Sequence, residues 1–153
     1  ATVEVFAGTT RLGTTTADNN GAWSFTPAAP LAEGAHTLRV AATDSYGNQS
    51  LISETLTLMI DATAPDAPGA PILALASDTG AAGDGITRDA APFVGGKAEP
   101  GSTVRVLRGD EMLATVAADG GTGDWSAQLA LVEGQHALTV IATDAAGNAS
   151  PRS

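Results

Sequence analysis

The segment EGQHALTVIATDAAGNAS, residues 133–150, decides the fold because a close copy of it, EGAHTLRVAATDSYGNQS, occupies residues 33–50. The two segments are identical at 11 of 18 positions. In the second copy, His136, Leu138, Val140 and Ala142 alternate with residues of the opposite face, which is the period of an extended chain. An Asp-x-x-Gly-Asn sequence follows in both copies. The pattern predicts a long β-strand that ends in a tight turn.

The repeat extends beyond these segments. TVEVFAG (2–8) aligns with TVRVLRG (103–109), and AWSF (22–25) aligns with DWSA (124–127). The period of about 100 residues is too long for a solenoid unit and is typical of a whole β-sandwich domain. The first copy has a final strand, LISETLTLMID, without a counterpart in the second, and the second copy has residues 71–101 without a counterpart in the first. We therefore expect a fragment of a longer tandem array.

The second repeat is predicted to form seven strands joined by turns, because short β-branched runs alternate with Gly and Pro. Since each strand reverses direction, TDAAGN (143–148) and AEPGS (98–102) are expected at the end beside the incoming linker. SDTGAAGDGITRDA (77–90) is expected at the opposite end. The predicted strands are 71–76, 92–97, 103–108, 111–117, 124–130, 135–143 and a last strand that begins near Ala149.

Composition narrows the possible partners. The chain has no Cys and a formal net charge of −10, so nucleic acid and anionic membranes are poor partners, whereas divalent cations are better ones. No apolar run approaches the roughly eighteen residues of a membrane span, and no membrane insertion is expected. Without disulfides, stability must come from the core, from metal ions or from neighbouring domains.

Three longer stretches carry a family resemblance: DATAPDAPGAPILALASDTGAAGDGIT (61–87), GKAEPGSTVRVLRG (96–109) and VIATDAAGNAS (140–150). Together they resemble the bacterial immunoglobulin-like repeats of giant, biofilm-associated, usually type I-secreted surface adhesins. The resemblance implies an all-β fold of tandem immunoglobulin-like antiparallel β-sandwiches. Residues 1–61 would be a repeat that lacks its first strands, and residues 62–153 a repeat that lacks its last strand. It also implies an extracellular stalk on the bacterial cell surface, stiffened by calcium near the domain junctions.

The carboxylates suggest where Ca²⁺ would bind, since this ion takes about six to eight oxygen ligands. The strand order brings Asp61 of the linker near Asp144, Asn148 and Glu99, which form the first candidate site. Asp78 and Asp84, in the Gly-rich loop, form the second. A structural alternative stays open for Asp144 and Asn148, which can shape a tight turn in which Gly147 supplies a positive φ. Their counterparts Asp44 and Asn48 lack a preceding linker, so calcium is expected beside Asp144 and not beside Asp44.

Other notable residues favour structural roles. His36 and His136 occupy equivalent positions without the partners of a catalytic triad or a His-x-x-x-His metal motif, so they are expected to anchor a loop. Trp23 and Trp125 are also equivalent, and packing in the core or at an edge is favoured over stacking on sugar rings. No nucleophile–base or acid pair recurs, so the chain is not expected to be an enzyme.

These features favour a structural spacer of a cell-surface adhesin that supports adhesion or biofilm formation. The alternative is an immunoglobulin-like module that binds a carbohydrate or a host protein, and an accessory domain of a secreted polysaccharide enzyme is a third reading. The expected partners are the neighbouring immunoglobulin-like repeats of the same chain and a host or matrix ligand bound through other domains. Exposed strand edges are also expected to pair with another copy of the chain.

Overall fold

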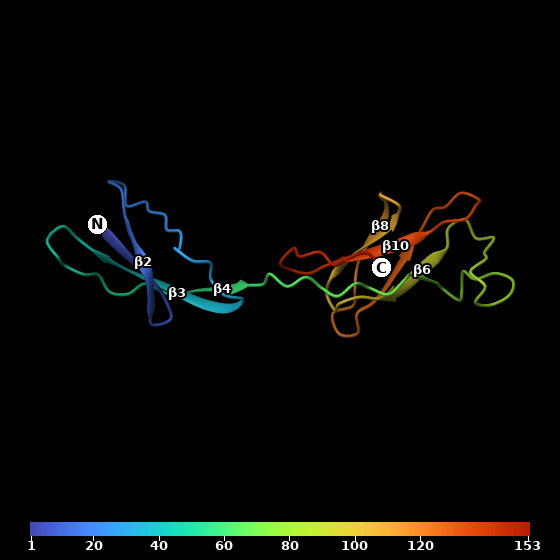
Figure 1. Ribbon diagram of the computed structural model, residues 1–153, viewed down its shortest axis with the longest axis horizontal. Coiled ribbons are helices and arrows are strands. Elements are labelled where there is room, and N and C mark those ends of the chain that lie inside the picture. The colour runs from blue at the N-terminus through green and yellow to red at the C-terminus, as the bar shows by residue number, and fades with distance from the viewer. The chain divides into compact units, whose positions relative to one another are not determined.

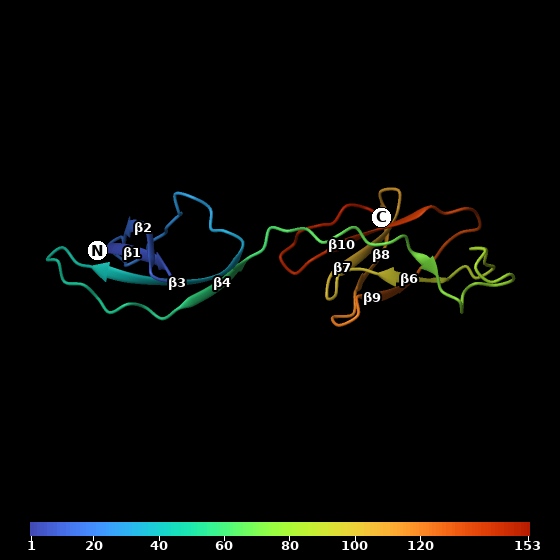
Figure 2. The same cartoon turned by 60° about the horizontal axis from the view of Figure 1, so that its bottom comes forward.

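The computed structural model describes all 153 residues, and the chain divides into two compact units, residues 1–62 and residues 63–153. In Figures 1 and 2 the colour runs from blue in the first unit to red in the second. All regular elements are β-strands, and the strand pairs are antiparallel. The structure has no helix that is long and apolar enough to cross a membrane.

The first unit is built on one four-stranded sheet with the order β2-β1-β3-β4. Its longest strand, β3, lies between β1 and β4 and has ten residues (Figure 1). Val3 and Val5 alternate along β1 and are buried on the same face of the sheet. The bounds are Thr2–Ala7 for β1, Thr10–Thr16 for β2, Gly34–Thr43 for β3 and Leu56–Ile60 for β4.

The segment between β2 and β3 forms no strand in the first unit. It contacts the sheet through Phe25, whose ring lies so close to Gly13 that a Cβ there would be only 2.8 Å from it. Trp23 is 44% exposed, so it does not lie in a core, and of the core or edge packing expected for both tryptophans only packing at an edge fits this one. In the second unit the equivalent Trp125 lies on β9, which pairs with β6, whereas Trp23 lies on no strand.

The second unit is a sandwich of two three-stranded sheets, β10-β7-β8 and β5-β6-β9. This two-layer arrangement confirms the predicted all-β sandwich fold. Figure 2 shows strands of both layers, with β7, β8 and β10 grouped on one side and β6 and β9 on the other. The bounds are Ile72–Leu73 for β5, Phe93–Lys97 for β6, Thr103–Arg108 for β7, Glu111–Ala117 for β8, Asp124–Gln128 for β9 and Leu138–Thr143 for β10.

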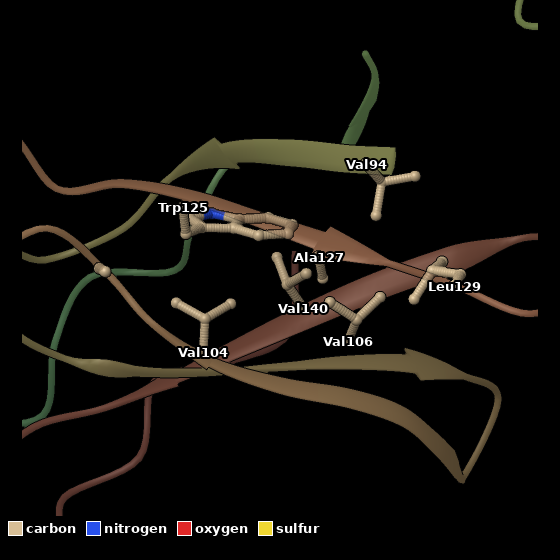
Figure 3. Close-up of a cluster of buried hydrophobic side chains, with 8 residues drawn as sticks. Val94, Val104, Val106, Trp125, Ala127, Leu129 and Val140 are labelled. Carbon is tan, nitrogen blue, oxygen red and sulfur yellow. The ribbon is translucent and has the colours of Figure 1, made fainter. Parts of the chain in front are cut away.

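The core of the second unit lies between these sheets. Figure 3 shows Trp125 and Val94 of one sheet facing Val104, Val106 and Val140 of the other. The last three valines are 0% exposed, and burial of each stabilises the fold by about 1.5 kcal/mol or more. Trp125 is 5% exposed, so the expected packing role is confirmed for this tryptophan.

The predicted strands agree best with the structure where both neighbours of a strand are present. Strands 103–108 and 111–117 have the predicted bounds. The predicted strand 135–143 is too long, because only residues 138–143 pair with β7. In the first unit the equivalent strand is longer because residues 34–38 also pair with β4. Three other predicted strands are shorter in the structure: 92–97 becomes 93–97, 124–130 becomes 124–128, and 71–76 becomes 72–73. Near Ala149, where a last strand was predicted to begin, only a single bridge to Thr143 forms.

The loops of the second unit gather at two ends, as predicted. Residues 66–69 of the incoming linker line a cavity together with residues 97–99, which places the 98–102 turn beside the linker. At the other end, the long loop around residues 79–92 lines a cavity together with residues 131–136. Because β10 runs back toward the linker end, the turn after Thr143 also lies there.

Candidate functional site

The turn after β10 is organised by the carboxylate of Asp144. Its Oδ1 accepts hydrogen bonds from the backbone N–H groups of Ala146, Gly147 and Asn148 at 2.9, 2.7 and 2.9 Å. Its Oδ2 accepts a hydrogen bond from Nδ2 of Asn148 at 2.8 Å. Gly147 has φ 97°, a left-handed conformation that glycine adopts at no steric cost. These contacts are those of the structural alternative, a tight turn closed by its own Asp.

The first unit repeats this turn almost atom for atom. Oδ1 of Asp44 accepts from the N–H groups of Tyr46 and Asn48 at 2.8 and 2.9 Å, and Oδ2 accepts from Nδ2 of Asn48 at 2.8 Å. Gly47 has φ 88°. The same turn therefore forms in both units from hydrogen bonds within the turn itself.

Hydrogen bonding also sets the protonation of both carboxyl groups. The side-chain hydrogen bond from Asn148 is the main cause that lowers the pKa of Asp144; desolvation opposes it, and the backbone N–H donors of Asn148, Gly147 and Ala146 lower the pKa further. The side-chain hydrogen bond from Asn48 lowers the pKa of Asp44 in the same way. Both groups are thus firmly ionised at neutral pH, which suits an acceptor of amide hydrogens and would equally suit a cation ligand.

The Gly-rich loop holds its two acidic side chains in separate local turns. Oδ2 of Asp78 accepts from the N–H of Gly83 at 2.6 Å, and Oδ1 of Asp84 accepts from the N–H of Ile86 at 2.8 Å. Oδ1 of Asp78 is buried without a hydrogen-bond partner. The loop is tied down by Thr87, whose hydroxyl donates to the carbonyl of Ser77 at 2.5 Å.

Glu99 lies in the turn that follows β6. Its backbone carbonyl accepts from the N–H and the hydroxyl of Ser102 at 3.1 and 2.7 Å, while its side chain is exposed. It lines a cavity of about 360 Å³ together with Asp66 of the linker and Lys97. Asp66 is a carboxylate that the sequence reasoning did not single out, although its place in the Pro-rich linker was the available signal. Asp61 is an exposed residue of the first unit.

No group of three or more His, Asp or Glu side chains gathers closely enough to hold a metal ion. The residues of the first candidate site are thus brought together in part: Asp144 contacts Asn148, and Glu99 lies at the same end of the second unit. Lys97 lines the same cavity as Glu99, and its Nζ lies 2.8 Å from Oδ1 of Asp124. Any cation at this end would need backbone carbonyl oxygens and water as further ligands.

A further acidic turn lies at the linker end. Oδ1 of Asp119 accepts from the N–H groups of Gly121 and Thr122 at 2.9 and 2.8 Å and from the hydroxyl of Thr122 at 3.1 Å. The backbone hydrogen bond from Thr122 is the main cause that lowers the pKa of Asp119. The signal in the sequence was an Asp followed by two glycines, which favours such a turn.

The two histidines anchor loops, as expected. Nε2 of His36 lies 2.6 Å from the carbonyl oxygen of Ala32, and Nε2 of His136 lies 2.8 Å from that of Val132. Nδ1 of His136 also lies 3.2 Å from the guanidinium of Arg108. Each imidazole thus holds the loop that leads into the long strand, which is a structural role.

Two tandem units of antiparallel β-strands, with an Asp-closed turn after β3 in one and after β10 in the other, define a class of small all-β modules. The family model described as "Bacterial Ig-like domain" matches residues 1–62 and again residues 64–153. The chain therefore belongs to the bacterial Ig-like domain family, with one domain in each unit.

Solved structures agree at the level of the fold. The chain is similar to the fibronectin(III)-like modules of Clostridium thermocellum CbhA, with a TM-score of 0.52 and 21% sequence identity over 99% of this chain and 74% of that one. A search of curated proteins found no match. The family and the fold together indicate that the chain is a bacterial structural or binding module of immunoglobulin-like fold.

Proposed function

We propose that the chain is part of the stalk of a bacterial cell-surface adhesin, where its domains act as mechanical spacers in cell adhesion or biofilm formation. The observation that carries the proposal is the duplication itself: two domains of one family follow each other, and both end their long strand in the same Asp-closed turn. In the second domain, the linker enters at one end, and the chain after Asn148 runs back along β10 toward the other end. Because the chain enters and leaves at opposite ends, such domains can be connected end to end.

The linker supports this function because it combines short length with proline. Residues 61–71 contain Pro65, Pro68 and Pro71, and proline restricts the backbone to extended conformations that make a linker semi-rigid. Pro65 and Pro68 are also buried. A proline-containing linker limits the conformations available between two spacer domains.

We further propose that calcium stiffens the array by binding beside this linker. Three features support a site there: Asp144 is ionised, Oδ2 of Asp144 accepts only the bond from Asn148, and Glu99 and Asp66 share one cavity. Asp61 and Asn148 would complete the set with backbone carbonyls and water. Asp78 and Asp84 would form a second site at the opposite end, where Oδ1 of Asp78 lacks a protein donor.

The proposed mechanism is a shift of population. Calcium that binds the docked arrangement of two domains better than the loose arrangement favours the docked one. With a dissociation constant of ~0.1 mM and a calcium concentration of ~1 mM, each site would contribute about 1.4 kcal/mol. A free energy of this size biases a hinge, but it does not fold a domain.

The test is a calcium titration followed by small-angle scattering and thermal melting. We expect calcium to narrow the distribution of maximum dimensions and to raise the melting temperature, and we expect Asp144→Asn combined with Glu99→Gln to remove both effects. Asp44→Asn is the matched control, since it alters the same turn in the first domain and leaves the cavity lined by Asp66 and Glu99 in the second domain unchanged. If chelator changes neither quantity in the parent chain, the calcium proposal is wrong, while the spacer function remains to be tested by measuring adhesion as domains are added or removed.

The second candidate function is a ligand-binding module. It is supported by two exposed aromatic side chains of the first domain, Trp23 at 44% and Tyr46 at 90% exposed, since exposed aromatic rings can stack on sugars. Binding of soluble polysaccharides, measured by affinity electrophoresis, tests it. Retardation that is lost in Trp23→Ala and kept in Trp125→Phe would favour the module over the spacer.

A further inference from the structure

The turn that follows β2 presents Asn20 directly before a glycine. Asn20 and Gly21 are both exposed, and Gly21 has φ 83° with open space where a Cβ would lie. The carboxamide of Asn20 makes no hydrogen bond, and only its backbone N–H is engaged, with Oδ1 of Asp18 at 2.8 Å. The side-chain carbonyl carbon of Asn20 is therefore able to approach the backbone nitrogen of Gly21.

The second domain shows that this turn does not need an asparagine. There the carboxylate of Asp119 closes the equivalent turn, and residues 120 and 121 are glycines. In both turns the N–H of the Asp donates across the turn, to the carbonyl of Ala22 at 2.9 Å and to that of Asp124 at 2.8 Å. Both turns are exposed. The fold thus makes no use of the carboxamide of Asn20.

The other asparagines are held or hindered. Asn48 and Asn148 lie in the Asp-closed turns, where each Nδ2 donates to a carboxylate oxygen at 2.8 Å. Neither is followed by glycine, and a side chain on the next residue hinders approach to its backbone nitrogen. Asn19 is hindered in the same way, because another asparagine follows it. Among the four asparagines of the chain, only Asn20 combines an unbonded carboxamide with a following glycine.

We propose that Asn20–Gly21 is a site of spontaneous deamidation, at which the first domain converts an amide into a carboxylate. The backbone nitrogen of Gly21 attacks Cγ of Asn20, and the side-chain nitrogen leaves as ammonia with the proton of the Gly21 N–H, so that a succinimide ring closes. Water then opens the ring. Its attack at Cγ gives aspartate, and its attack at the backbone carbonyl carbon gives isoaspartate. Only water is consumed and only ammonia is released, so the reaction needs no enzyme and no cofactor.

The hydrogen bonds around the reacting peptide allow this reaction. The N–H of Gly21 donates to the backbone carbonyl of Asp18 at 3.1 Å, which is near the long end of the range for such bonds. The bond lies in an exposed turn, where local opening costs little free energy. Opening of this one bond releases the attacking nitrogen.

Isoaspartate should disturb the turn more than aspartate does. In isoaspartate the chain continues through Cγ, which inserts an extra carbon between residue 20 and Gly21. Oδ1 of Asp18 holds the N–H groups on both sides of that link, those of Asn20 and Ala22, at 2.8 and 2.9 Å. The extra carbon moves these two donors apart. Both products also add a negative charge beside Asp18, in a chain with a net charge of −10, so we expect deamidation to loosen this turn.

Peptide mapping after incubation of the whole chain at mildly alkaline pH tests the site. Trypsin separates the asparagines into three peptides: 12–39 with Asn19 and Asn20, 40–88 with Asn48, and 109–152 with Asn148. Fragment-ion spectra distinguish the two asparagines of the first peptide. We expect the mass change from NH₂ to OH to accumulate at Asn20 about tenfold or more faster than at any other asparagine, because only there the next residue lacks a Cβ. Equal rates, or a faster change at another asparagine, would overturn the proposal.

The variant Ala149→Gly separates the effect of the fold from that of the sequence, because it places a glycine after Asn148. In the folded chain Asp144 still holds the carboxamide of Asn148, so its deamidation should stay about tenfold or more slower than that of Asn20. In urea, where this hydrogen bond is lost, the two rates should agree within about twofold. Equal rates in the folded chain, or a difference that persists in urea, would contradict protection by the fold. The emission of Trp125 verifies that the variant is folded.

The variant Asn20→Asp tests the effect on the turn, because it has the new charge and an unchanged backbone. We expect the isoaspartate form, separated from the aged chain by chromatography, to melt at a lower temperature than Asn20→Asp. The emission of Trp23 in a Trp125→Phe background follows this melting. Equal melting temperatures would show that the turn tolerates the extra carbon and would overturn the proposed loosening. The spacer and calcium proposals invoke other residues and do not depend on these outcomes.

Discussion

At the scale of single residues, the carboxylate of Asp144 closes the turn that ends β10, and its protonation should weaken that turn. Hydrogen bonds lower its pKa below the ordinary value of 3.8. A group whose folded pKa is depressed stabilises the fold above the unfolded pKa, and this contribution is lost as the pH falls through the folded pKa. The stability that Asp144 provides is therefore complete at neutral pH and is lost only below about pH 4.

The side chain of Asn148 is the first cause of this depression, which gives a direct test. We expect Asn148→Ala to raise the pKa of Asp144 toward 3.8, because the bond from Nδ2 to Oδ2 is lost while the backbone donors remain. Carboxyl carbon shifts measured by NMR against pH report this titration. Asn48→Ala is the control, since it should shift Asp44 and leave Asp144 unchanged. An unaltered titration of Asp144 in Asn148→Ala would show that the backbone donors alone hold the charge.

Gly123 is constrained both by its backbone and by its neighbour. It has φ 73°, and a Cβ placed on it would collide with the backbone carbonyl oxygen of Ala98. Gly109 has a similar φ of 58° but open space around it. We expect Gly109→Ala to lower the free energy of unfolding by about 1 kcal/mol, from backbone strain alone, and Gly123→Ala to lower it by about 3 kcal/mol or more, because the backbone must also move. Urea unfolding measures both, and equal losses would contradict the collision.

At the scale of elements, two serines fasten the C-terminal residues to β10. The hydroxyl of Ser150 accepts from the N–H of Ala142 at 3.0 Å, and that of Ser153 accepts from the N–H of Val140 at 3.0 Å. Ser50 and Ser53 make the same contacts with Ala42 and Val40 on β3. The serine side chains thus replace backbone acceptors where the returning chain is irregular.

Burial differs between the two serine pairs, so their removal should have unequal effects. Ser150 is 6% exposed, whereas Ser50 is exposed. We expect Ser150→Ala to lower the unfolding free energy of the second domain by about 1–3 kcal/mol, because the N–H of Ala142 is left buried without an acceptor. Ser50→Ala should cost about 0.5 kcal/mol or less, because water can replace the hydroxyl. A comparable loss in both variants, measured by denaturant unfolding, would contradict the role of burial.

The strand bounds show which parts of the fold can be predicted from sequence alone. Residues 103–108 and 111–117 could be predicted within their bounds because alternation and a tight turn are local signals. The bounds of the strand predicted at 135–143 could not be predicted in the same way. Only residues 138–143 pair with β7, and residues 135–137 form no strand. Trp23 and Trp125, alike in sequence, differ in exposure, and only Trp125 lies on a strand, which pairs with β6. Local pattern predicts an extended conformation, and only the neighbouring strand decides whether it becomes a strand.

The candidate site was predictable to a similar extent. An Asp-x-x-Gly-Asn sequence at the end of a strand indicates both a turn and possible oxygen ligands, and the turn is the part that local hydrogen bonds determine. Asp78 and Asp84 lie in one loop but close two separate turns. Whether such groups share a cation depends on carbonyls and side chains that are distant in sequence, which no local pattern specifies.

At the scale of the whole molecule, the two domains differ in how much core they possess. Only Val3, Val5 and Ala41 are buried hydrophobic residues of the first domain, whereas ten such residues lie in the second. Four of the ten, Val104, Val106, Val140 and Ala142, are 0% exposed. Since burial of apolar surface is the main favourable contribution to folding, the second domain should be the more stable one.

Thermal unfolding should therefore occur in two transitions, with the first domain melting at a temperature about 10 °C or more below the second. Each domain contains one tryptophan, so single-tryptophan variants separate the transitions: Trp125→Phe leaves Trp23 to report on the first domain, and Trp23→Phe leaves Trp125 to report on the second. The buried Trp125 should also show the larger change in emission wavelength, because it moves from the core into water. Coincident transitions in the two variants would mean that the domains unfold as one cooperative unit, and the first domain would then have to draw stability from contacts outside its own small core.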